Sequence, residues 1–427
     1  MKFKKIIATA LASIMAVSLA ACGGSGDADG KVTLRIGVPN GDTLTPFSLI
    51  EEFKAANPDI NVELDEAPWG DFTTKLTTQI AGGTAPDVFI HDSGATMSFG
   101  ANGAAMNLSD KIASDLNADD YISALYAAKD ADGNVWGVPH GLNVVGLYYN
   151  EALFDEAGLA YPDETWTMND VLEAAKKLTA PVDASGASPV YGFGLTYAIT
   201  VGWLPFVMST GGAPLNEAKT ESNFNDPKVL EGVKLMNEFV ESKVAPPVAW
   251  YTTQGGMEAA FANGKIAMAF MNSAAMKVIN TNAGEDFRYN VTAMPLGADG
   301  SRDTVYVPNC WIINKASAPE KQEAAWKWLK IYLSEETQLK LAEEIRGGFP
   351  IHKKAIEYCQ NVETKPADRA VMLKHLDATG TTLWENPLWS EWRNKMDKAC
   401  LEMVEGRMSP EQVVEKVHKE VSEVLAD

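Results

Sequence analysis

Residues that bind metal ions or form cross-links are scarce in this sequence. Only five histidines and four cysteines occur among 427 residues, and the histidines are scattered. A structural zinc site needs a tetrahedral set of such side chains at short spacings, and no such pattern is present. We therefore expect no metal and no cofactor, and a chain of this length can bury a large core without covalent cross-links.

Signatures of common catalytic sites are also missing. The sequence contains no G-x-x-x-x-G-K-[ST] phosphate loop, no H-E-x-x-H zinc helix and no G-x-S-x-G nucleophile elbow. Asp130–Asn134 (DADGN) is acidic like a calcium loop but lacks the closing glutamate, so a hairpin turn is the better interpretation. The many carboxylates leave a glycosidase pair open, but no spacing sets two of them face to face. No enzymatic activity is predicted.

Basic residues are fewer than acidic ones in this sequence. The chain has 36 Lys and Arg residues against 57 Asp and Glu residues, a formal net charge of −21. Residues 1–21 carry three lysines and no acid, so their removal takes the charge to −21 − 3 = −24. So acidic a surface argues against binding to nucleic acid or to anionic lipid.

Long apolar runs are confined to the amino end. Lys2, Lys4 and Lys5 precede the apolar run Ile6–Ala21, which is typical of a secretion signal and short for a membrane span of roughly 20 apolar residues. Leu19-Ala20-Ala21-Cys22 resembles the bacterial lipobox, in which the cysteine is acylated and becomes the first residue. The resemblance implies a signal peptide over 1–21, a lipid on Cys22 and a place at the extracytoplasmic face of the cell membrane.

A flexible tether is predicted to follow the lipid. Residues 22–30 are rich in Gly, Ser and Asp, which build no core, so the folded part should start near Lys31. The remaining length suits two large domains or three small ones. Cys310, Cys359 and Cys400 are an odd set, best interpreted as small buried hydrophobes, with a Cys359–Cys400 disulfide as the alternative.

The first part of the folded chain alternates strands and helices. Apolar residues alternate with polar ones from Val32 to Val38, and a helix from Thr45 to Asn57 precedes a second strand at Ile60–Leu64. Asp71 is interpreted as the cap of a further helix, and the apolar run Val88–Ile90 as a strand covered on both faces. This order predicts an α/β lobe with a mainly parallel sheet.

The later chain keeps mixing strands and helices. Val135–Pro139 and Val144–Tyr149 are interpreted as consecutive strands. Thr167 with Asp170 is typical of a capped helix start. Further helices are expected from Pro319 and from Ser409, where a proline or a cap residue precedes apolar residues at helical spacing.

Several long segments together resemble one known family. They are VTLRIGVPN, then FSLIEEFKAANPDINVELDEAPWGDFTTKLTTQIAGGTAPDVFI, then GNVWGVPHGLNVVGLYYNEALFDEAGL, FANGKIAMAFMNSAAM and GGFPIHKKA. In this order and spacing they resemble family 1 extracellular solute-binding proteins, the sugar-binding components of ABC importers, similar to maltose-binding protein. The resemblance covers nearly the whole chain after the tether, although no single motif is diagnostic.

The resemblance implies a two-lobed periplasmic-binding-protein-like α/β fold of type II, with a hinged cleft between the lobes. Chain crossings are expected near His140-Gly141, Pro308-Asn309 and Gly348-Phe349. They give a first lobe of residues 31–140 plus 309–348 and a second lobe of 141–308 plus 349–427. A cleft of this kind can close by hinge rotation and bury a small ligand.

Candidate binding residues follow from what carbohydrates require. Their C–H faces pack on Trp, Tyr and Phe rings, and planar polar side chains hydrogen-bond their hydroxyls. Ligands of open α/β sheets lie beyond the carboxyl ends of strands. The candidates near strand ends or crossings of the first lobe are Asn40, Trp69, Asp71, His91, Asp92, Asn143, Asn309 and Trp311.

The second lobe and the later chain supply the remaining candidates. They follow apolar runs, prolines or a long helix, and they are Trp203, Phe206, Trp250, Asn272, Arg346, Gly347, Phe349, Trp384 and Glu385. For each aromatic ring core packing is the alternative, and for Asp71 it is helix capping.

The expected function is to capture a carbohydrate, in particular an oligosaccharide, outside the cell as a monomer and to hand it to the permease subunits of an ABC importer. Three alternatives stay open: a same-fold binder of another solute, a surface-tethered glycan-degrading enzyme, and a structural adhesin. Scarce His and Cys argue against metal as the solute. The identity, linkage and length of a sugar do not follow from the sequence.

Overall fold

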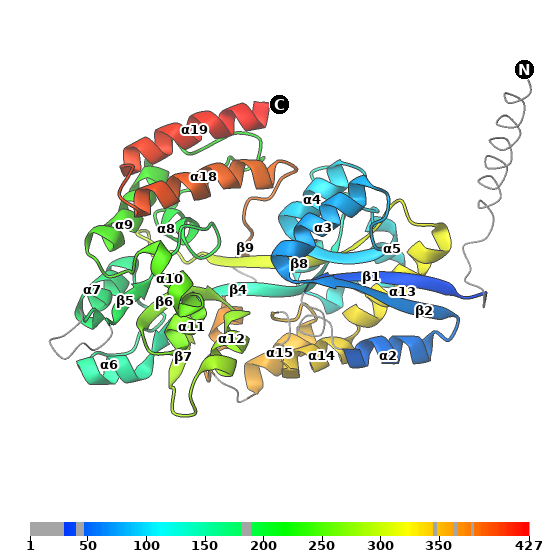
Figure 1. The fold of residues 1–427 in the computed structure, drawn as a ribbon, viewed down its shortest axis with the longest axis horizontal. Helices are drawn as coiled ribbons and strands as arrows, with labels where there is room; N and C mark the ends of the chain where they lie inside the picture. The colour runs from blue at the N-terminus through cyan, green and yellow to red at the C-terminus, as the bar shows by residue number, and fades with distance from the viewer. Residues whose placement is uncertain are drawn as a thin grey trace, which may run out of the picture.

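The computed structural model describes residues 30–39, 47–180, 189–344, 348–362, 366–376 and 380–426. They form two α/β lobes side by side, joined through the middle of one mixed sheet (Figure 1). Cys22, Asn40, Arg346 and Gly347, which the sequence singled out, lie outside the described residues.

The first lobe begins as the sequence predicts. Strands β1 (Val32–Pro39), β2 (Ile60–Ala67) and β3 (Val88–Asp92) are parallel to one another, with β1 in the middle. Helices α2 (Phe47–Ala56) and α3 (Trp69–Ala81) connect them. The predicted cap at Asp71 is wrong: α3 starts two residues earlier, after Pro68, and Asp71 lies in its exposed first turn.

The two expected strands around His140 are one strand, which corrects the sequence interpretation. β4 runs without a break from Val138 to Asn150 and pairs first with β8 (Thr304–Ile313), then with β6 (Ile266–Asn272) and β7 (Tyr289–Thr292). Its register shifts between Pro139 and Gly141, a bulge that re-aims the strand without ending it. β4 and β8 therefore pass through both lobes and link them (Figure 1).

The second lobe continues the sheet outward. Strand β6 (Ile266–Asn272) pairs antiparallel with β4, and β5 (Tyr191–Gly194) is parallel to β6. The full path is β2-β1-β3-β8-β4-β6-β5, with β7 (Tyr289–Thr292) on β4 and β9 (Gly380–Thr381) on β8. Helix α7 (Met168–Leu178) starts at the predicted capping box of Thr167 and Asp170.

Helices cover both faces of the sheet. On the first lobe these include α4 (Ser93–Ala101), α5 (Ser109–Asp115), α13 (Pro319–Leu333) and α14 (Glu335–Glu344), with the turns Ala118–Asp120 and Ser123–Tyr126. The others are α6 (Glu151–Ala157), α8 (Trp203–Ser209), α9 (Pro227–Glu241), α10 (Val248–Gln254), α11 (Met257–Ala262), α12 (Ala275–Asn282), α15 (Lys353–Asn361), α16 (Val371–Lys374), α18 (Trp389–Val404) and α19 (Pro410–Ala426). The helices predicted from Pro319 and Ser409 are confirmed.

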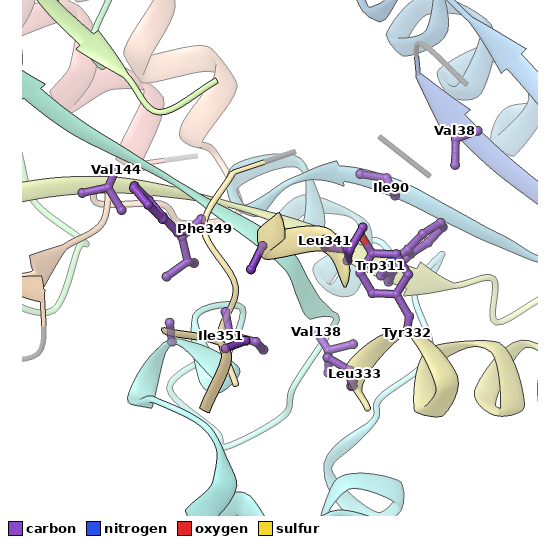
Figure 2. Packing of buried hydrophobic residues seen from close by; sticks show 14 of the residues in the cluster. Val38, Ile90, Val138, Val144, Trp311, Tyr332, Leu333, Leu341, Phe349 and Ile351 are labelled. Carbon is purple, nitrogen blue, oxygen red and sulfur yellow. The ribbon is translucent and has the colours of Figure 1, made fainter. Parts of the chain in front are cut away.

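Two sequence-predicted binding residues belong to the hydrophobic core instead. Trp311 is fully buried, and its ring centroid lies 5.2 Å from that of Tyr332 and 5.6 Å from that of Trp328. Phe349 is buried in the same cluster and pairs with Leu142. Figure 2 shows Trp311 beside Tyr332 and Phe349 near Val144. Packing of this kind does not fit the ligand contacts expected of Trp311 and Phe349.

The three described cysteines are free and buried, as the favoured interpretation expects. Cys359 packs in the core cluster shared by β1, β3 and β8, whereas Cys400 packs in the cluster of the second lobe. Burial raises the pKa of all three thiols, and for Cys359 the value is about 11. A Cys359–Cys400 disulfide is absent because the two thiols lie in separate cores.

The contacts of the chain after residue 348 indicate where one lobe ends and the other begins. Helix α15 packs against α14 of the first lobe, and His352 pairs with Tyr121 of that lobe. We keep the division at 348 as a proposal, with α15 bordering both lobes (Figure 1). Within the described parts of the chain, no helix combines the length and apolar character needed to cross a membrane.

Candidate ligand-binding site between the lobes

The carboxyl end of β3 carries the first polar side chains of the site. His91 is buried, and Asp92 ends the strand and caps α4 by accepting a hydrogen bond from the Ala95 backbone N–H at 2.9 Å. The His91 Nδ1 lies 2.9 Å from the Asp92 backbone nitrogen and 3.0 Å from Asp92 Oδ2. Without a proton, Nδ1 accepts a hydrogen bond from the Asp92 backbone N–H. With a proton, Nδ1 donates to Asp92 Oδ2. The sequence placed this pair at a strand end, and the structure confirms that position.

The neighbours of Asp92 lower the pKa of its carboxyl group. Burial by itself would raise its pKa, but hydrogen bonds from His91 and the Ala95 backbone, together with the charge of Arg393, hold the pKa below its usual value. The helix amino terminus also favours a negative charge at this position. Asp92 is therefore an ionised hydrogen-bond acceptor at neutral pH, with its side chain still partly open to solvent.

The chain between β9 and α18 brings a second carboxylate to the same place. We call residues 382–388 the connector. Trp384 has a φ of 58°, a left-handed conformation that bulky residues rarely adopt. The next residue, Glu385, is buried, and its Oε1 accepts a hydrogen bond of 2.5 Å from the Ser93 hydroxyl. The strained turn at Trp384 thus directly precedes Glu385, whose carboxylate is hydrogen-bonded to the first lobe.

The start of α18 closes over the same corner. The Trp389 ring packs on Gly94, where an added Cβ would come within 2.2 Å of Trp389 Cε3. Arg393, one turn later, lies over that ring with its Cζ 4.3 Å from the centroid, a cation–π contact. Arg393 Nε has no hydrogen-bond partner among the described atoms. We call Asp92, Ser93, Glu385, Trp389 and Arg393 the interlobe corner.

Asp397 lies next to the interlobe corner, where its carboxyl group is close to Arg393. It accepts a 2.8 Å hydrogen bond from Trp203 Nε1, and its Oδ2 lies 3.6 Å from Arg393 Nε. Burial raises the pKa of Asp397 to about 6, although the Trp203 hydrogen bond and the Arg393 charge oppose the rise. Asp397 therefore carries its negative charge beside Arg393 mainly above about pH 6.

Tyr306 of β8 borders the same region. Burial, with the nearby carboxylate of Glu385, raises the pKa of Tyr306 to about 12, so its hydroxyl stays protonated. The interlobe corner and Tyr306 together offer two carboxylates, a guanidinium, a phenol and an indole. The polar groups of this set can hydrogen-bond several hydroxyls, whereas the Trp389 ring is buried against Gly94 with Arg393 over it. The described residues hold no cluster suited to a metal ion.

The structure brings some of the predicted residues together. His91, Asp92 and Glu385 meet at or beside the interlobe corner, and Asn309 is buried and pairs with Asp92 in the β3–β8 ladder. Trp384 is partly buried next to Glu385. These residues come from three distant parts of the sequence.

Other predicted residues lie further off. Asn272 ends β6 and accepts from the Ala274 backbone N–H. Asn143 is half-buried on β4, with an Oδ1 near Gly348 that lacks a hydrogen bond. Trp250, on α10, packs against Tyr191 with ring centroids 5.2 Å apart. Trp69 begins α3, and nothing further is described for its side chain.

Trp203 and Phe206 do not lie at the cleft, which corrects the expected stacking role. Both are fully buried on α8 in the core of the second lobe. Phe206 packs with Phe239 and Phe270, and Trp203 packs with Phe224. The Gly-Pro-interrupted stretch that suggested a loop forms a short buried helix instead.

Sequence reasoning left Ser93, Trp389, Arg393 and Asp397 out of the site. One signal could have found three of them: Trp389, Arg393 and Asp397 are spaced by four and so share one face of a helix. Ser93 carried no signal of its own, because its role depends on a residue 292 positions away.

A family model and several known proteins match this chain over most of its length. Residues 48–339 match the family model described as bacterial extracellular solute-binding protein. A binding protein of Brucella abortus is 28% identical over 341 residues, covering 79% of this chain and 80% of the relative. The diacetylchitobiose-binding protein of Streptomyces coelicolor is 26% identical and covers 100% of this chain and 99% of the relative.

Solved structures share the fold. An ABC substrate-binding protein from Listeria monocytogenes, in complex with cycloalternan, superposes with a TM-score of 0.82 at 25% identity, covering 93% of this chain and 99% of that one. A maltose-bound protein from Thermotoga maritima gives a TM-score of 0.76 at 21% identity, with 91% and 99% covered. The family match spans more than half of the sequence, and these neighbours have the two-lobed form expected above. This chain therefore belongs to the bacterial extracellular solute-binding protein family.

Proposed function

We propose that this protein captures a carbohydrate outside the cell and delivers it to an ABC importer. The observation that carries the proposal is the interlobe corner, where Asp92 and Glu385, from different lobes, converge with Trp389 and Arg393. Fixed carboxylate acceptors beside a guanidinium can hydrogen-bond the hydroxyls of a polyhydroxylated ring. Relatives whose names or titles specify diacetylchitobiose, cycloalternan and maltose support the class of ligand.

The protein acts as a binder and not as an enzyme in this proposal. Ligand contacts both lobes at once and so stabilises the closed arrangement, which is the form recognised by the permease subunits. A ligand shifts such an equilibrium only through its differential affinity for the closed state. We further propose that five other predicted residues make additional contacts with the ligand, namely Asn143, Trp250, Asn272, Asn309 and Trp384.

A thermal-shift screen of the chain without residues 1–21 tests this function. The panel contains neutral oligosaccharides, amino acids, polyamines and glycerol phosphate. Ligand at 100 times Kd stabilises the fold by about 2.7 kcal/mol, which raises Tm measurably. A rise with oligosaccharides alone supports carbohydrate capture, whereas a rise with another class alone assigns a different solute. Chromatography of the incubated sugars detects products and thereby tests for a glycan-degrading activity.

Attachment to the membrane through Cys22 is part of the proposal. It is supported by the basic start, the apolar run and the Leu-Ala-Ala-Cys sequence. In cells fed labelled palmitate, the wild type should carry label and sediment with membranes. Cys22→Ser should carry no label and appear in the soluble fraction, while Cys359→Ser, the matched control, should behave as the wild type. Label retained on Cys22→Ser would overturn the anchor.

A further inference from the structure

Residues 348–352 lie against β4, the strand that passes through both lobes, and we call them the strap. Phe349 and Leu142 exchange two backbone hydrogen bonds, each 2.8 Å long. Gly348 allows this close approach, because its φ is 108° and an added Cβ would lie 2.5 Å from the Leu142 carbonyl oxygen. Figure 2 shows Phe349 of the strap near Val144 of β4. The bulge of β4 lies just before Leu142, so the strap holds β4 next to the point where it bends.

The strap is also tied to the first lobe. The Ile351 backbone N–H donates to Gln338 Oε1 of α14 at 3.0 Å, and the Ile351 carbonyl accepts from the Ile122 backbone N–H at 3.1 Å. Gln338 is fully buried, and its Nε2 donates to the Tyr332 carbonyl of α13 at 3.1 Å, which fixes its position. A change in how the strap docks on the first lobe therefore reaches β4 through only a few residues.

His352 ends the strap inside the first lobe. It is buried, it pairs with Tyr121 in a backbone bridge, and its ring meets the Tyr121 ring edge-on with centroids 5.3 Å apart. Tyr121 is held in turn, because its hydroxyl donates to the Leu333 carbonyl at 3.0 Å. His352 Nδ1 is buried without a hydrogen-bond partner among the described atoms, so the site accommodates a neutral ring by packing alone.

The surroundings of His352 disfavour a positive charge. The charged and titratable groups near its ring come from three elements, and they are Asp119, Asp120 and Tyr121 at the turn Ala118–Asp120, Glu335 of α14, and Lys353 and Lys354 of α15. Burial lowers the pKa of His352, and Lys354 lowers it further, although Glu335 and Asp120 act in the opposite direction. The amino terminus of α15 also opposes a cation at this position. The ring is therefore neutral at neutral pH.

We propose that the strap is an acid-sensitive fastening: protonation of His352 expels its ring from the first lobe, undocks the start of α15 from Tyr121 and loosens the strap on β4, so that the lobes open. The pKa of His352 is lower in the folded chain than its usual 6.5. Its packing therefore stabilises the fold fully above pH 6.5, and this stabilisation is lost as pH falls through the lower folded value. The inference goes beyond the proposed function, because acid releases any solute that is held between the lobes.

Hydrogen exchange of the chain without residues 1–21 and without ligand tests the proposal. At pH 5.0, compared with pH 7.5 and corrected for the intrinsic rate, the amides of residues 349–361 should lose protection at least about fivefold, whereas those of α7 should not. His352→Phe keeps an aromatic ring against Tyr121 but cannot take up a proton, so its protection should be equal at the two pH values. His418→Asn removes a half-buried histidine of α19 and is the matched control, which should respond to acid as the wild type does.

Two measurements on the wild type keep the test independent of how well His352→Phe folds. The radius of gyration from small-angle scattering should rise between pH 7.5 and pH 5.0. The ring of His352, followed by NMR, should titrate below pH 6.5 with the same midpoint as the loss of protection. Unchanged protection or an unchanged radius in the wild type would overturn the proposal, as would separate midpoints or an equal loss of protection in His352→Phe. No sugar is used, so this result is separate from that of the thermal-shift screen.

Discussion

The carboxylate of Glu385 and the hydroxyl of Ser93 meet 2.5 Å apart, although 292 residues separate them in the chain. Both side chains are buried, and each belongs to a different side of the interlobe junction. A hydrogen bond to a charged acceptor contributes about 1.5–3 kcal/mol when it is buried and well aligned. This pair is therefore a contact that favours the closed arrangement.

Replacement of Ser93 by alanine should open the protein. Ser93→Ala leaves the Glu385 carboxylate buried without its donor, and water can satisfy it only when the lobes part. We expect a larger radius of gyration without ligand in small-angle scattering, and about tenfold weaker ligand binding. Ser114→Ala, on the exposed surface of α5, is the control. An unchanged radius and affinity would show that the pair does not contribute to closure.

Gly94 offers a steric test of closure. Its missing side chain makes room for Trp389, and a Cβ would lie 2.2 Å from that ring. Gly94→Ala should therefore push α18 away from α4 and weaken ligand binding by an order of magnitude or more, while each lobe stays folded. Gly284→Ala, which meets no atom within 4 Å, is the matched control. Calorimetry with scattering on both variants checks this, and tight binding by Gly94→Ala would contradict it.

Trp203 should matter for stability and not for ligand contact. Trp203→Ala empties a fully buried site in the second lobe and should lower the free energy of unfolding by about 3–5 kcal/mol. Urea unfolding measures the loss, and titration at low temperature measures affinity in the protein that remains folded. A large loss of affinity with unchanged stability would return Trp203 to the binding site.

Asp397 predicts a specific pH dependence of stability. Its pKa rises to about 6 on folding, so the group favours the folded state below its unfolded pKa of 3.8, and this advantage is lost as pH rises through 6. The loss amounts to about 3 kcal/mol for a shift of about two units. Asp397→Asn should remove this dependence.

The test compares urea unfolding of the wild type and Asp397→Asn from pH 4.5 to pH 8. The stability of the wild type relative to the variant should fall as pH rises through 6. A difference that stays constant over this range would show that Asp397 has an ordinary pKa. Asp132→Asn, at an exposed turn position, controls for the loss of one charge.

The parts of the fold that sequence predicted are those set by local patterns. The alternation in β1, the capping box of α7 and the proline starts of α13 and α19 need only near neighbours, and each appears where expected. The break expected within β4 did not occur, because a bulge absorbs the irregular residues while pairing with β8 continues. Local composition does not reveal a bulge that depends on a partner strand.

The site was harder to predict than the fold for a physical reason. Strand ends can be located from one segment, which placed Asp92 correctly. A tryptophan in a segment interrupted by Gly and Pro has the same local signature in a core as at a cleft, so Trp203 was misplaced. The contact of Glu385 with Ser93 exists only once the chain has crossed between the lobes, and no local pattern encodes it.

The most direct test of the whole account combines a neutral oligosaccharide with small-angle scattering on the Ser93→Ala protein. The account predicts that this open variant returns to the compact radius of the wild type when saturating sugar is added, with heat released in a parallel titration. A variant that stays open with sugar bound, or a wild-type chain that binds no neutral sugar at all, would contradict the claim that carbohydrate closes the two lobes.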